Sequence, residues 1–400
     1  MRVLIADAFE QSGLDALGES GIEIDYRPQL QSADLADAVD AADVLIVRST
    51  RVEADVFKKP GPLGLVIRAG AGTNTIDTAA AAASAVFVAN VPGKNAVAVA
   101  ELAMGLILAL DRRIADNVAE ARAGTWNKKS YSQADGLLGK TLGIIGLGQI
   151  GLAVAERAAA FGLGTLVVEK ERDQATRERM KAVGIETVPS EGDLIERSDI
   201  ITIHVPGSEE TRSMVDAEFL ARMRPGATLI NTSRGDVIDE AALLAVIDDK
   251  DLRVGIDVFA DEPAASTGEF VSALASHPRV YTTHHIGAST AQAQEAIAAE
   301  VVSMIRDYKK GIARNVVNLT VPTAVGAILV VRHFDRVGVL SAVLAALREA
   351  GLNVQEMQNQ VFAGAGASVA SIHVQGMVPD SVYQKVAANP DVIFTTIRAS

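Results

Sequence analysis

Acidic, basic and imidazole side chains gather in three segments, each directly after an apolar run that predicts a strand. The segments are 231–239 (NTSRGDVID), 257–263 (DVFADEP) and 282–290 (TTHHIGAST). In doubly wound sheets, ligands bind at the carboxyl ends of the parallel strands. We therefore expect one site that contains Arg234, Asp257, Glu262, His284 and His285.

An arginine, a carboxylate and a histidine suit the oxidation of a 2-hydroxy acid. A histidine can remove the hydroxyl proton near neutral pH. Glu262 would orient the imidazole, and Arg234 would bind the substrate carboxylate and polarise the oxygen on C2. Taken alone, each of these residues equally fits a surface ion pair or a helix start; their succession along the chain favours catalysis.

A glycine-rich turn predicts the site of the hydride acceptor that such a reaction needs. It reads Gly146-Leu-Gly148-Gln-Ile-Gly151, follows an apolar strand and opens a helix. Gly146 permits a tight turn, Gly148 lets the backbone approach a pyrophosphate, and Gly151 lets the helix pack closely on the strand. The helix N-terminus offers N–H donors to the phosphates. The alternative is a glycine turn in an ordinary βαβ unit, which this context disfavours.

The choice of dinucleotide depends on Glu169, which ends the next predicted strand. A carboxylate at this position accepts hydrogen bonds from ribose hydroxyls and repels a 2′-phosphate. This predicts NAD rather than NADP as the cofactor, although the nearby Lys170 and Arg172 weaken the preference.

Composition excludes several other classes of function. The 400 residues include 37 Lys and Arg against 50 Asp and Glu, a formal net charge of −13. Such a chain repels phosphate backbones and anionic lipids, so nucleic acid and membrane partners are not expected. The absence of cysteine excludes disulfides, thiolate catalysis and cysteine-bound zinc, and no metal site is expected.

The start of the chain and its most apolar stretch bear on localisation. The first residues, MRVLIADAF, look like a strand rather than a signal peptide. Glu101 and Asp111 interrupt the most apolar stretch, which is too short to span a membrane. We expect a cytoplasmic protein that acts on a small molecule.

Short β-branched runs alternate with alanine-rich helical patterns along most of the chain. The predicted strands are 2–7, 43–49, 64–70, 85–91, 141–146, 165–169, 199–205, 227–233, 253–259 and 279–285. Apolar strands separated by helices indicate parallel sheets covered on both faces, and ten strands exceed one ordinary sheet. The predicted fold class is α/β, with two doubly wound Rossmann-like domains. A helix over 95–123 would lead from the first domain to the second, and a helix over 291–310 would lead back.

The pattern changes after an irregular stretch at 311–326. Strands are predicted at 327–334, 353–362, 367–376 and 392–398, and helices at 338–351 and 381–390. This order is βαββαβ, a ferredoxin-like split βαβ unit. The expected domains are a substrate-binding domain (1–95 and 290–316), an NAD-binding domain (96–289) and a C-terminal domain (326–400).

Several segments resemble blocks of a known family. GLGQIG, NTSRGDVIDEAAL, GIDVFADEP and THHIGAST resemble the signature blocks of D-2-hydroxyacid dehydrogenases, and LIVRS, IRAGAGTNTID and VANVPGKNAVAVAE resemble its phosphoglycerate dehydrogenases. The similarity covers nearly the whole chain. It implies oxidation of 3-phospho-D-glycerate with hydride transfer to NAD, and it implies Arg234, Glu262 and His285 as the catalytic residues.

The resemblance also implies the binding residues. The cofactor contacts would be Gly146, Gly148, Gln149, Ile150, Gly151, Glu169, His204, Val205, Pro206, Thr232, Ser233, Asp257 and Gly287. Asp257 would lie near the nicotinamide amide. The substrate contacts would be Arg48, Ser49, Arg68, Ala71, Gly72, Asn74 and, from a neighbouring subunit, Lys128. Arg48 and Arg68 would hold the phosphate.

The chain departs from the family pattern without losing a catalytic group. His284 stands where the family usually has Pro, but the Ile-Gly-Ala-Ser-Thr that follows favours His285 as the acid/base. Glu169 replaces the commoner Asp, and Ser233 replaces the commoner Ala.

The C-terminal segment resembles an ACT domain, a module that binds amino acids in regulated enzymes. The regulatory contacts would be His333, Asp335, Gly338 and Asn353. Asn353 matches a contact of serine-binding relatives, which implies L-serine as an effector. Val337 and Asp335 replace the usual Pro and Asn, so a purely structural dimerisation domain is the alternative. A homodimer or homotetramer is expected.

Three functions remain open on this basis. The first is a phosphoglycerate dehydrogenase that begins the phosphorylated route to L-serine. The second is a glyoxylate or hydroxypyruvate reductase, which usually lacks an ACT tail. The third is an NAD-sensing scaffold or corepressor on the same fold.

Overall fold

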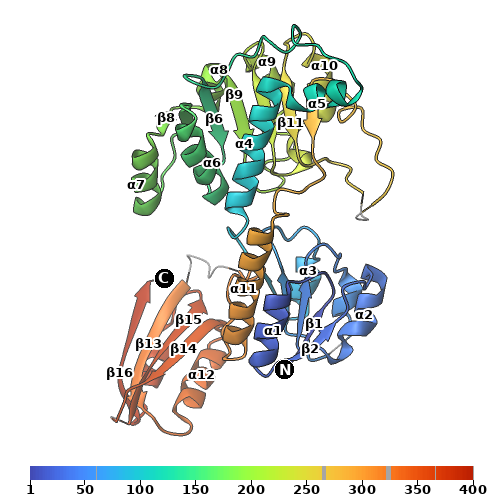
Figure 1. Ribbon diagram of the computed structural model, residues 1–400. Helices are drawn as coiled ribbons and strands as arrows, with labels where there is room; N and C mark the ends of the chain where they lie inside the picture. The colour runs from blue at the N-terminus through green and yellow to red at the C-terminus, as the bar shows by residue number, and fades with distance from the viewer. Residues whose placement is uncertain (60, 264–266, 321–325, 365, 400) are drawn as a thin grey trace. The chain divides into compact units, whose positions relative to one another are not determined.

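The computed structural model describes residues 1–59, 61–263, 267–320, 326–364 and 366–399 (Figure 1). The chain forms two compact units, Met1–Asn318 and Leu319–Ser400. The predicted irregular stretch 311–326 contains the boundary between them, and its residues 321–325 lie outside the described residues. None of the helices in the described ranges is both long enough and apolar enough to cross a membrane.

The first sheet of unit 1 is parallel, with the order β2-β1-β3-β4-β5. Its strands are β1 (Arg2–Ile5), β2 (Glu23–Tyr26), β3 (Val44–Val47), β4 (Leu65–Arg68) and β5 (Phe87–Asn90). The helices that accompany it are α1 (Gln11–Glu19), α2 (Leu35–Ala38), α3 (Thr78–Ala83) and α11 (Ala291–Tyr308), with 3₁₀ turns η1 (Ser32–Asp34), η2 (Val39–Ala41) and η3 (Ala54–Phe57).

Alternation along the strands distributes apolar side chains to both faces of this sheet. Val3 and Ile5 pack with residues of α1 and α11, whereas Leu4 packs with residues of α2, α3 and η3. Helix α11 thus returns to the first sheet, as the sequence predicted, although it lies 200 residues further along the chain than β5.

The second sheet of unit 1 is also parallel, with the order β12-β11-β10-β9-β6-β7-β8. Its strands are β6 (Thr141–Ile145), β7 (Gly164–Val168), β8 (Glu186–Val188), β9 (Ile200–Ile203), β10 (Thr228–Asn231), β11 (Arg253–Ile256) and β12 (Val280–Thr282). The helices are α4 (Ala96–Arg112), α5 (Ile114–Arg122), α6 (Gln149–Ala160), α7 (Gln174–Val183), α8 (Glu191–Arg197), α9 (Ala217–Arg222) and α10 (Glu240–Val246), with the 3₁₀ turn η4 (Gly235–Val237). The strand order reverses between β6 and β9, which creates a ligand-binding crevice in such sheets.

All ten strands predicted for this part of the chain are present. The pattern missed β2 and β8, which are edge strands with sequences EIDY and ETV and are mostly solvent-accessible. The predicted helix over 95–123 is wrong as one element: Arg113 adopts φ 49°, which separates the buried α4 from α5, a helix without buried residues.

Unit 2 has the predicted order βαββαβ. Its elements are β13 (Gly326–Phe334), α12 (Val339–Glu349), β14 (Val354–Val361), β15 (Ala367–Gln375), α13 (Asp380–Ala387) and β16 (Val392–Ala399). The sheet is antiparallel with the order β14-β15-β13-β16. Leu329 and Val331 of β13 and Ile372 of β15 form a core with apolar residues of α12 and α13.

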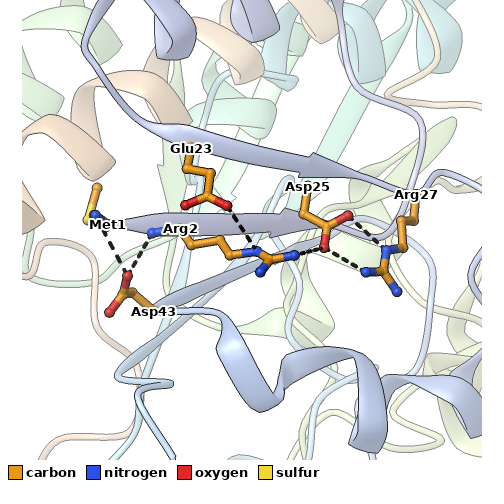
Figure 2. A network of polar contacts seen from close by, with 6 residues as sticks. All are labelled: Met1, Arg2, Glu23, Asp25, Arg27 and Asp43. Carbon is orange, nitrogen blue, oxygen red and sulfur yellow. Dashed lines mark hydrogen bonds and ion pairs between the residues drawn. The ribbon is translucent and has the colours of Figure 1, made fainter.

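A polar network fastens the edge strand β2 to the first sheet (Figure 2). Asp25 of β2 accepts hydrogen bonds from Arg2 of β1 (2.8 Å) and twice from Arg27 (2.8 Å each). At the start of β1, Asp43 accepts a hydrogen bond from the Arg2 backbone N–H at 2.6 Å. The hydrogen bonds from Arg27 lower the pKa of Asp25, burial opposes them, and Arg2 adds to the lowering.

We expect Asp25→Asn to reduce the free energy of unfolding by about 1 kcal/mol near neutral pH, since it removes charge-assisted hydrogen bonds from a side chain that is only 15% exposed. The folded-state pKa of Asp25 is lowered, so its ionised form stabilises the native state above the ordinary aspartate range. That contribution is lost as the pH falls through the lowered pKa. Chemical denaturation of both proteins should therefore show a constant difference between about pH 5 and 8 and a shrinking one below about pH 4.

Asp37→Asn is the matched control, because Asp37 pairs with Lys59 at 2.9 Å but is 90% exposed. Its loss of stability should be close to zero. Equal losses for the two variants would contradict the importance assigned to the Asp25 network.

Candidate active site

The glycine-rich turn lies at the reversal point of the second sheet. Gly146, after β6, has φ +97°, and a Cβ there would collide with the backbone of His204 after β9. Gly151 packs against Ile144 and the Gly146 carbonyl, again without room for a side chain. At Gly148 a Cβ would meet nothing within 4 Å. Two glycines are thus needed for close packing, and the third leaves open space where a ligand can approach the backbone.

Helix α6 begins directly after this open position, with Gln149 and Ile150 in its first turn. The N-terminus of a 12-residue helix at the reversal point is suited to phosphate binding. The glycines thus have the space and the backbone geometry that a dinucleotide pyrophosphate requires.

Glu169 follows β7 and is exposed, and its backbone N–H donates to the Val188 carbonyl at 2.8 Å. Arg172 folds back onto the same strand end, where its Nη2 donates to the Val168 carbonyl at 2.7 Å. Glu169, the carboxylate expected to bind the ribose hydroxyls, is therefore followed by the guanidinium of Arg172 at the same strand end.

His204, Val205 and Pro206 follow β9, opposite the glycine turn. The His204 imidazole lies 2.9 Å from the Thr202 hydroxyl and 3.5 Å from the Thr232 hydroxyl. Burial lowers the pKa of His204 to about 3, so the ring is neutral at physiological pH. With a neutral imidazole between two hydroxyls, this side of the site is polar but uncharged.

His285 and Glu262 form a hydrogen-bonded pair: His285 Nδ1 and Glu262 Oε2 lie 2.7 Å apart. The other carboxylate oxygen of Glu262 accepts a hydrogen bond from the Phe259 N–H at 2.9 Å, which fixes the carboxylate. Burial raises the pKa of Glu262, but hydrogen bonds from His285 and Phe259 and the charge of Arg234 outweigh it, so the pKa is lowered. The structure pairs Glu262 with His285 and not with His284.

Asp257 holds the turn that carries His285. Its Oδ1 accepts hydrogen bonds from the Thr283 hydroxyl (2.6 Å) and the Ile286 N–H (2.9 Å), and its Oδ2 accepts one from the Gly287 N–H (2.9 Å). His285 itself has φ +50°, a left-handed conformation that costs energy for a non-glycine residue. The buried Asp257 carboxylate thus fixes this turn, a role the sequence did not reveal.

Arg234 lies at the start of η4, after β10. Asn231 stabilises this loop: its side chain donates to the Arg234 carbonyl at 2.8 Å and accepts hydrogen bonds from the N–H and hydroxyl of Ser233. Thr232 and Ser233 are buried beside it. Burial lowers the pKa of Arg234, and the charges of Asp236 and Glu262 partly oppose that effect.

Two other guanidinium groups, those of Arg48 and Arg234, act electrostatically on the guanidinium of Arg68. Burial and the like charges of Arg234 and Arg48 lower the pKa of Arg68 to about 10. The Nε of Arg68 is buried and has no hydrogen-bond partner in the described part of the chain. A Cβ at Gly70 would collide with the Arg68 guanidinium, and one at Gly72 with that of Arg234. The loop after β4 therefore leaves room for two cations.

The other expected substrate residues are placed as follows. Ser49 and Asn74 are exposed, and the Ala71 carbonyl accepts a hydrogen bond from Asn90 at 2.5 Å. Lys128 is exposed in the segment after α5.

The expected regulatory residues do not meet within one chain. His333 is buried, with its Nδ1 2.8 Å from the Phe334 carbonyl and its Nε2 3.2 Å from Asn359 Oδ1. Asp335 and Gly338 follow it in the exposed turn before α12, where Gly338 has φ +94°.

Strand register places Asn353 at the other end of that sheet. His333 lies opposite Ser368 near the start of β15, whereas the Asn353 carbonyl accepts a hydrogen bond from Gln375 at the end of β15. Seven residues of strand, roughly 20 Å, separate these ends. The expectation that both side chains converge on one ligand is therefore wrong for a single chain.

Sequence reasoning missed four residues that organise the site: Asp7, Asn90, Asn231 and Thr283. All four lie at or beyond the carboxyl ends of strands, so the strand-end rule could have identified them. The hydrogen bonds of Asp7, Asn90 and Thr283 reach residues 19 to 43 positions away, and no local pattern predicts such partners. Asn231 bonds to Arg234, three positions away. Among the described residues, no group of three or more His, Cys, Asp or Glu side chains is placed to hold a metal ion.

Comparison with known proteins gives consistent relatives. Residues 104–287 match the family described as D-isomer specific 2-hydroxyacid dehydrogenase, NAD binding domain. A hydroxypyruvate reductase of Thermotoga maritima is 41% identical over 278 residues, which are 69% of this chain and 88% of that protein. A D-3-phosphoglycerate dehydrogenase of Methanocaldococcus jannaschii is 36% identical over 322 residues, 80% of this chain but 60% of that longer protein.

Solved structures agree with this similarity. A D-lactate dehydrogenase from Aquifex aeolicus, complexed with NAD and lactic acid, has a TM-score of 0.66 and 26% identity, and the match covers 78% of this chain and 96% of that one. The chain spans less than two thirds of the phosphoglycerate dehydrogenase relative but nearly the whole of the reductase and the lactate dehydrogenase. With the glycine turn and the paired Glu262 and His285, these matches show that the chain belongs to the family of D-isomer specific 2-hydroxyacid dehydrogenases.

Proposed function

We propose that this chain is an NAD-dependent dehydrogenase that oxidises 3-phospho-D-glycerate to 3-phosphohydroxypyruvate, the first step of the phosphorylated route to L-serine. The cluster of Arg48, Arg68 and Arg234 carries the proposal. A 2-hydroxy acid needs one guanidinium for its carboxylate, and the further cations suit a second anionic group. The phosphoglycerate dehydrogenase relative supports the same substrate.

In this proposal the two sheets of unit 1 belong to different domains, one that binds the substrate and one that binds the cofactor. Residues 1–95 and 290–316 form the substrate-binding domain and contribute Arg48 and Arg68. Residues 96–289 form the NAD-binding domain and contribute the catalytic residues. Unit 2, including residues 326–400, is an ACT regulatory domain.

NAD, when bound, supplies the hydride acceptor. The residues available to hold it fit a dinucleotide: the open backbone at Gly148 and the start of α6 suit the pyrophosphate, and Glu169 suits the ribose. Val205, Pro206 and Thr232 would line the cofactor beside the neutral ring of His204. Gly287 is buried, with its N–H committed to Asp257.

His285 is the proposed acid/base. With its Nδ1 proton donated to Glu262, its Nε2 carries the lone pair that accepts the substrate hydroxyl proton. Glu262 holds the ring and stabilises the imidazolium that forms. Arg234 binds the C1 carboxylate and stabilises negative charge on the C2 oxygen. Proton removal at this oxygen accompanies departure of the hydride from C2, which leaves the carbonyl of the product.

The phosphate is proposed to bind Arg48, Arg68 and the loop at Ser49. The polar atoms of Ala71, Gly72 and Asn74 contact the remainder of the substrate. Lys128 is proposed to reach a neighbouring subunit's site in a homodimer or homotetramer.

A reductase of hydroxypyruvate is the second candidate, because the Thermotoga maritima relative with that name is 41% identical. The two candidates differ in whether the substrate carries a phosphate. Initial rates of NADH formation with 3-phospho-D-glycerate and with D-glycerate, each with NAD and NADP, test the proposal. It predicts the highest kcat/KM for the phosphorylated acid with NAD; higher kcat/KM for D-glycerate would favour the reductase.

Unit 2 is proposed to pair with a second copy and bind an amino acid, L-serine, between copies. Within one copy, His333 and Gly338 lie at one end of the sheet and Asn353 at the other. A two-fold arrangement in which Asn353 of one copy contacts the end of the partner's sheet that carries His333 and Gly338 would bring these residues together twice, since contacts in an isologous interface are reciprocal.

The assignment of the acid/base predicts different results for the two adjacent histidines. His285→Ala should reduce kcat by about 10²- to 10⁴-fold, the usual contribution of a general acid/base. NADH binding, measured by fluorescence titration, should change little. His284→Ala should retain activity, because His284 has no hydrogen bond to Glu262; swapped results would move the catalytic role to His284.

The assignment of the phosphate site predicts a selective effect of Arg48→Ala. Loss of a charge-assisted hydrogen bond, about 1.5–3 kcal/mol, should raise the KM for 3-phospho-D-glycerate roughly 10- to 100-fold. The KM for D-glycerate should stay within about 3-fold. A uniform increase for both acids would instead indicate a role of Arg48 in folding.

The regulatory proposal predicts that L-serine at millimolar concentration inhibits the full chain or raises its melting temperature. Asn353→Ala should weaken this response, because it removes a ligand amide. Gln358→Ala, which alters an exposed amide on β14, should not. If no amino acid changes either activity or melting temperature, unit 2 has only a structural role.

A further inference from the structure

The carboxylate of Asp7 accepts hydrogen bonds from the loop that begins with Arg48. Its Oδ2 accepts hydrogen bonds from three consecutive backbone N–H groups, those of Arg48 (2.6 Å), Ser49 (3.0 Å) and Thr50 (3.0 Å). Its Oδ1 accepts the Thr50 hydroxyl at 3.0 Å. One side chain therefore determines the path of the backbone where the chain leaves β3.

The sheet explains why Asp7 reaches this loop. β1 and β3 are parallel neighbours in which Ile5 lies opposite Ile46, and the Ala6 N–H donates to the Ile46 carbonyl at 3.0 Å. Asp7 and Arg48 are each two residues further on. A short carboxylate at this point can accept the N–H groups that the neighbouring strand exposes as it ends.

The hydrogen bonds of Asp7 also affect the arginine cluster. The four donors of the loop engage both oxygens of the carboxylate, three at Oδ2 and one at Oδ1. Asp7 is close enough to Arg68 for its charge to act on that guanidinium. It thus offsets part of the repulsion among the cations while its oxygens remain bound to the loop, which leaves guanidinium N–H groups for a ligand.

We propose that Asp7 is a positioning residue for the substrate phosphate: it shapes the loop 48–50 so that the side chains of Arg48 and Ser49 face the phosphate together with Arg68. This inference rests on the proposed function, because it takes the second anionic group of the substrate to be a phosphate. Asp7 touches the loop and not the reacting atoms.

The direction of the effect separates this role from a simple charge effect. If Asp7 acted only as a negative charge near an anion site, its neutralisation would strengthen phosphate binding and lower the KM. If Asp7 shapes the loop, its neutralisation misplaces Arg48 and Ser49 and raises the KM. Asp7→Asn removes the charge and keeps the size. Its single neutral carbonyl oxygen accepts the backbone N–H groups more weakly than a carboxylate does, and its NH₂ group cannot accept the hydroxyl proton of Thr50.

We expect Asp7→Asn to raise the KM for 3-phospho-D-glycerate about 10-fold or more, with kcat within about 3-fold and the KM for NAD unchanged. Thr50→Val, which loses one of the four hydrogen bonds, should raise the same KM by about 2- to 3-fold. Thr50→Ser keeps the hydroxyl and should resemble the wild type. A fall or no change in KM for Asp7→Asn would overturn the proposal.

Asp43→Asn is the matched control at the opposite end of the same sheet. Asp43 also accepts a backbone N–H, that of Arg2 at 2.6 Å (Figure 2), but Asp43 directly precedes β3, whereas Arg48 directly follows it. It should lower the melting temperature without raising the KM for the phosphorylated acid. An equal rise in KM for both variants would mean that general destabilisation explains the effect.

Hydrogen–deuterium exchange with inorganic phosphate gives a readout that does not depend on turnover. Phosphate should protect the peptide containing residues 48–50 in the wild type, and Asp7→Asn should both accelerate exchange there and abolish the protection. If wild type binds phosphate but does not turn over 3-phospho-D-glycerate, the proposed function fails and the exchange result still decides the role of Asp7. Unchanged protection in Asp7→Asn would rule that role out.

Discussion

The rest of the site is adapted to one constraint: the Arg68 guanidinium is buried near two like charges, those of Arg234 and Arg48. Burial and these charges lower the pKa of Arg68 to about 10, and its Nε has no hydrogen-bond partner in the described part of the chain. Groups arranged this way are more stable with an anion than without one. The surrounding chain makes the arrangement possible: glycines at 70 and 72 provide space, and Asp7 supplies a nearby negative charge.

The proposed catalytic pair shows the same division between reacting and supporting groups. His285 and Glu262 are arranged for proton transfer, but His285 adopts a left-handed conformation. Asp257 stabilises that turn through hydrogen bonds to Thr283, Ile286 and Gly287. Two aspartates at strand ends, Asp7 and Asp257, thus hold the loops that carry Arg48 and His285. Rigid strands position the loops, and carboxylates determine their local path.

Much of this architecture could be predicted from the sequence, because buried parallel strands are continuous apolar runs. The apolar runs of β1, β3 and β6 predict strands, and the context of Gly146 identifies the reversal point of the second sheet. The edge strands β2 and β8 were missed because their exposed faces carry polar residues. The break at Arg113 was missed because helical periodicity continues on both sides of it.

Sequence patterns do not predict the long-range hydrogen bonds or the register of the strands. Asp7 lies 41 residues from Arg48, and nothing local marks either as the partner of the other. The resemblance named His333 and Asn353 together, but the antiparallel register separates them within one copy. Local residue types predicted the chemistry of the site, whereas the supporting contacts depended on the three-dimensional fold.

The central claim is that the arginine cluster recognises a second anionic group on the substrate. Calorimetric titration of the complex with NADH measures this most directly, with 3-phosphohydroxypyruvate and hydroxypyruvate as paired ligands. The account predicts that the phosphorylated acid binds at least about 100-fold more tightly, equivalent to about 2.7 kcal/mol, and that the difference decreases as salt concentration rises. Equal affinity for the two acids would contradict it.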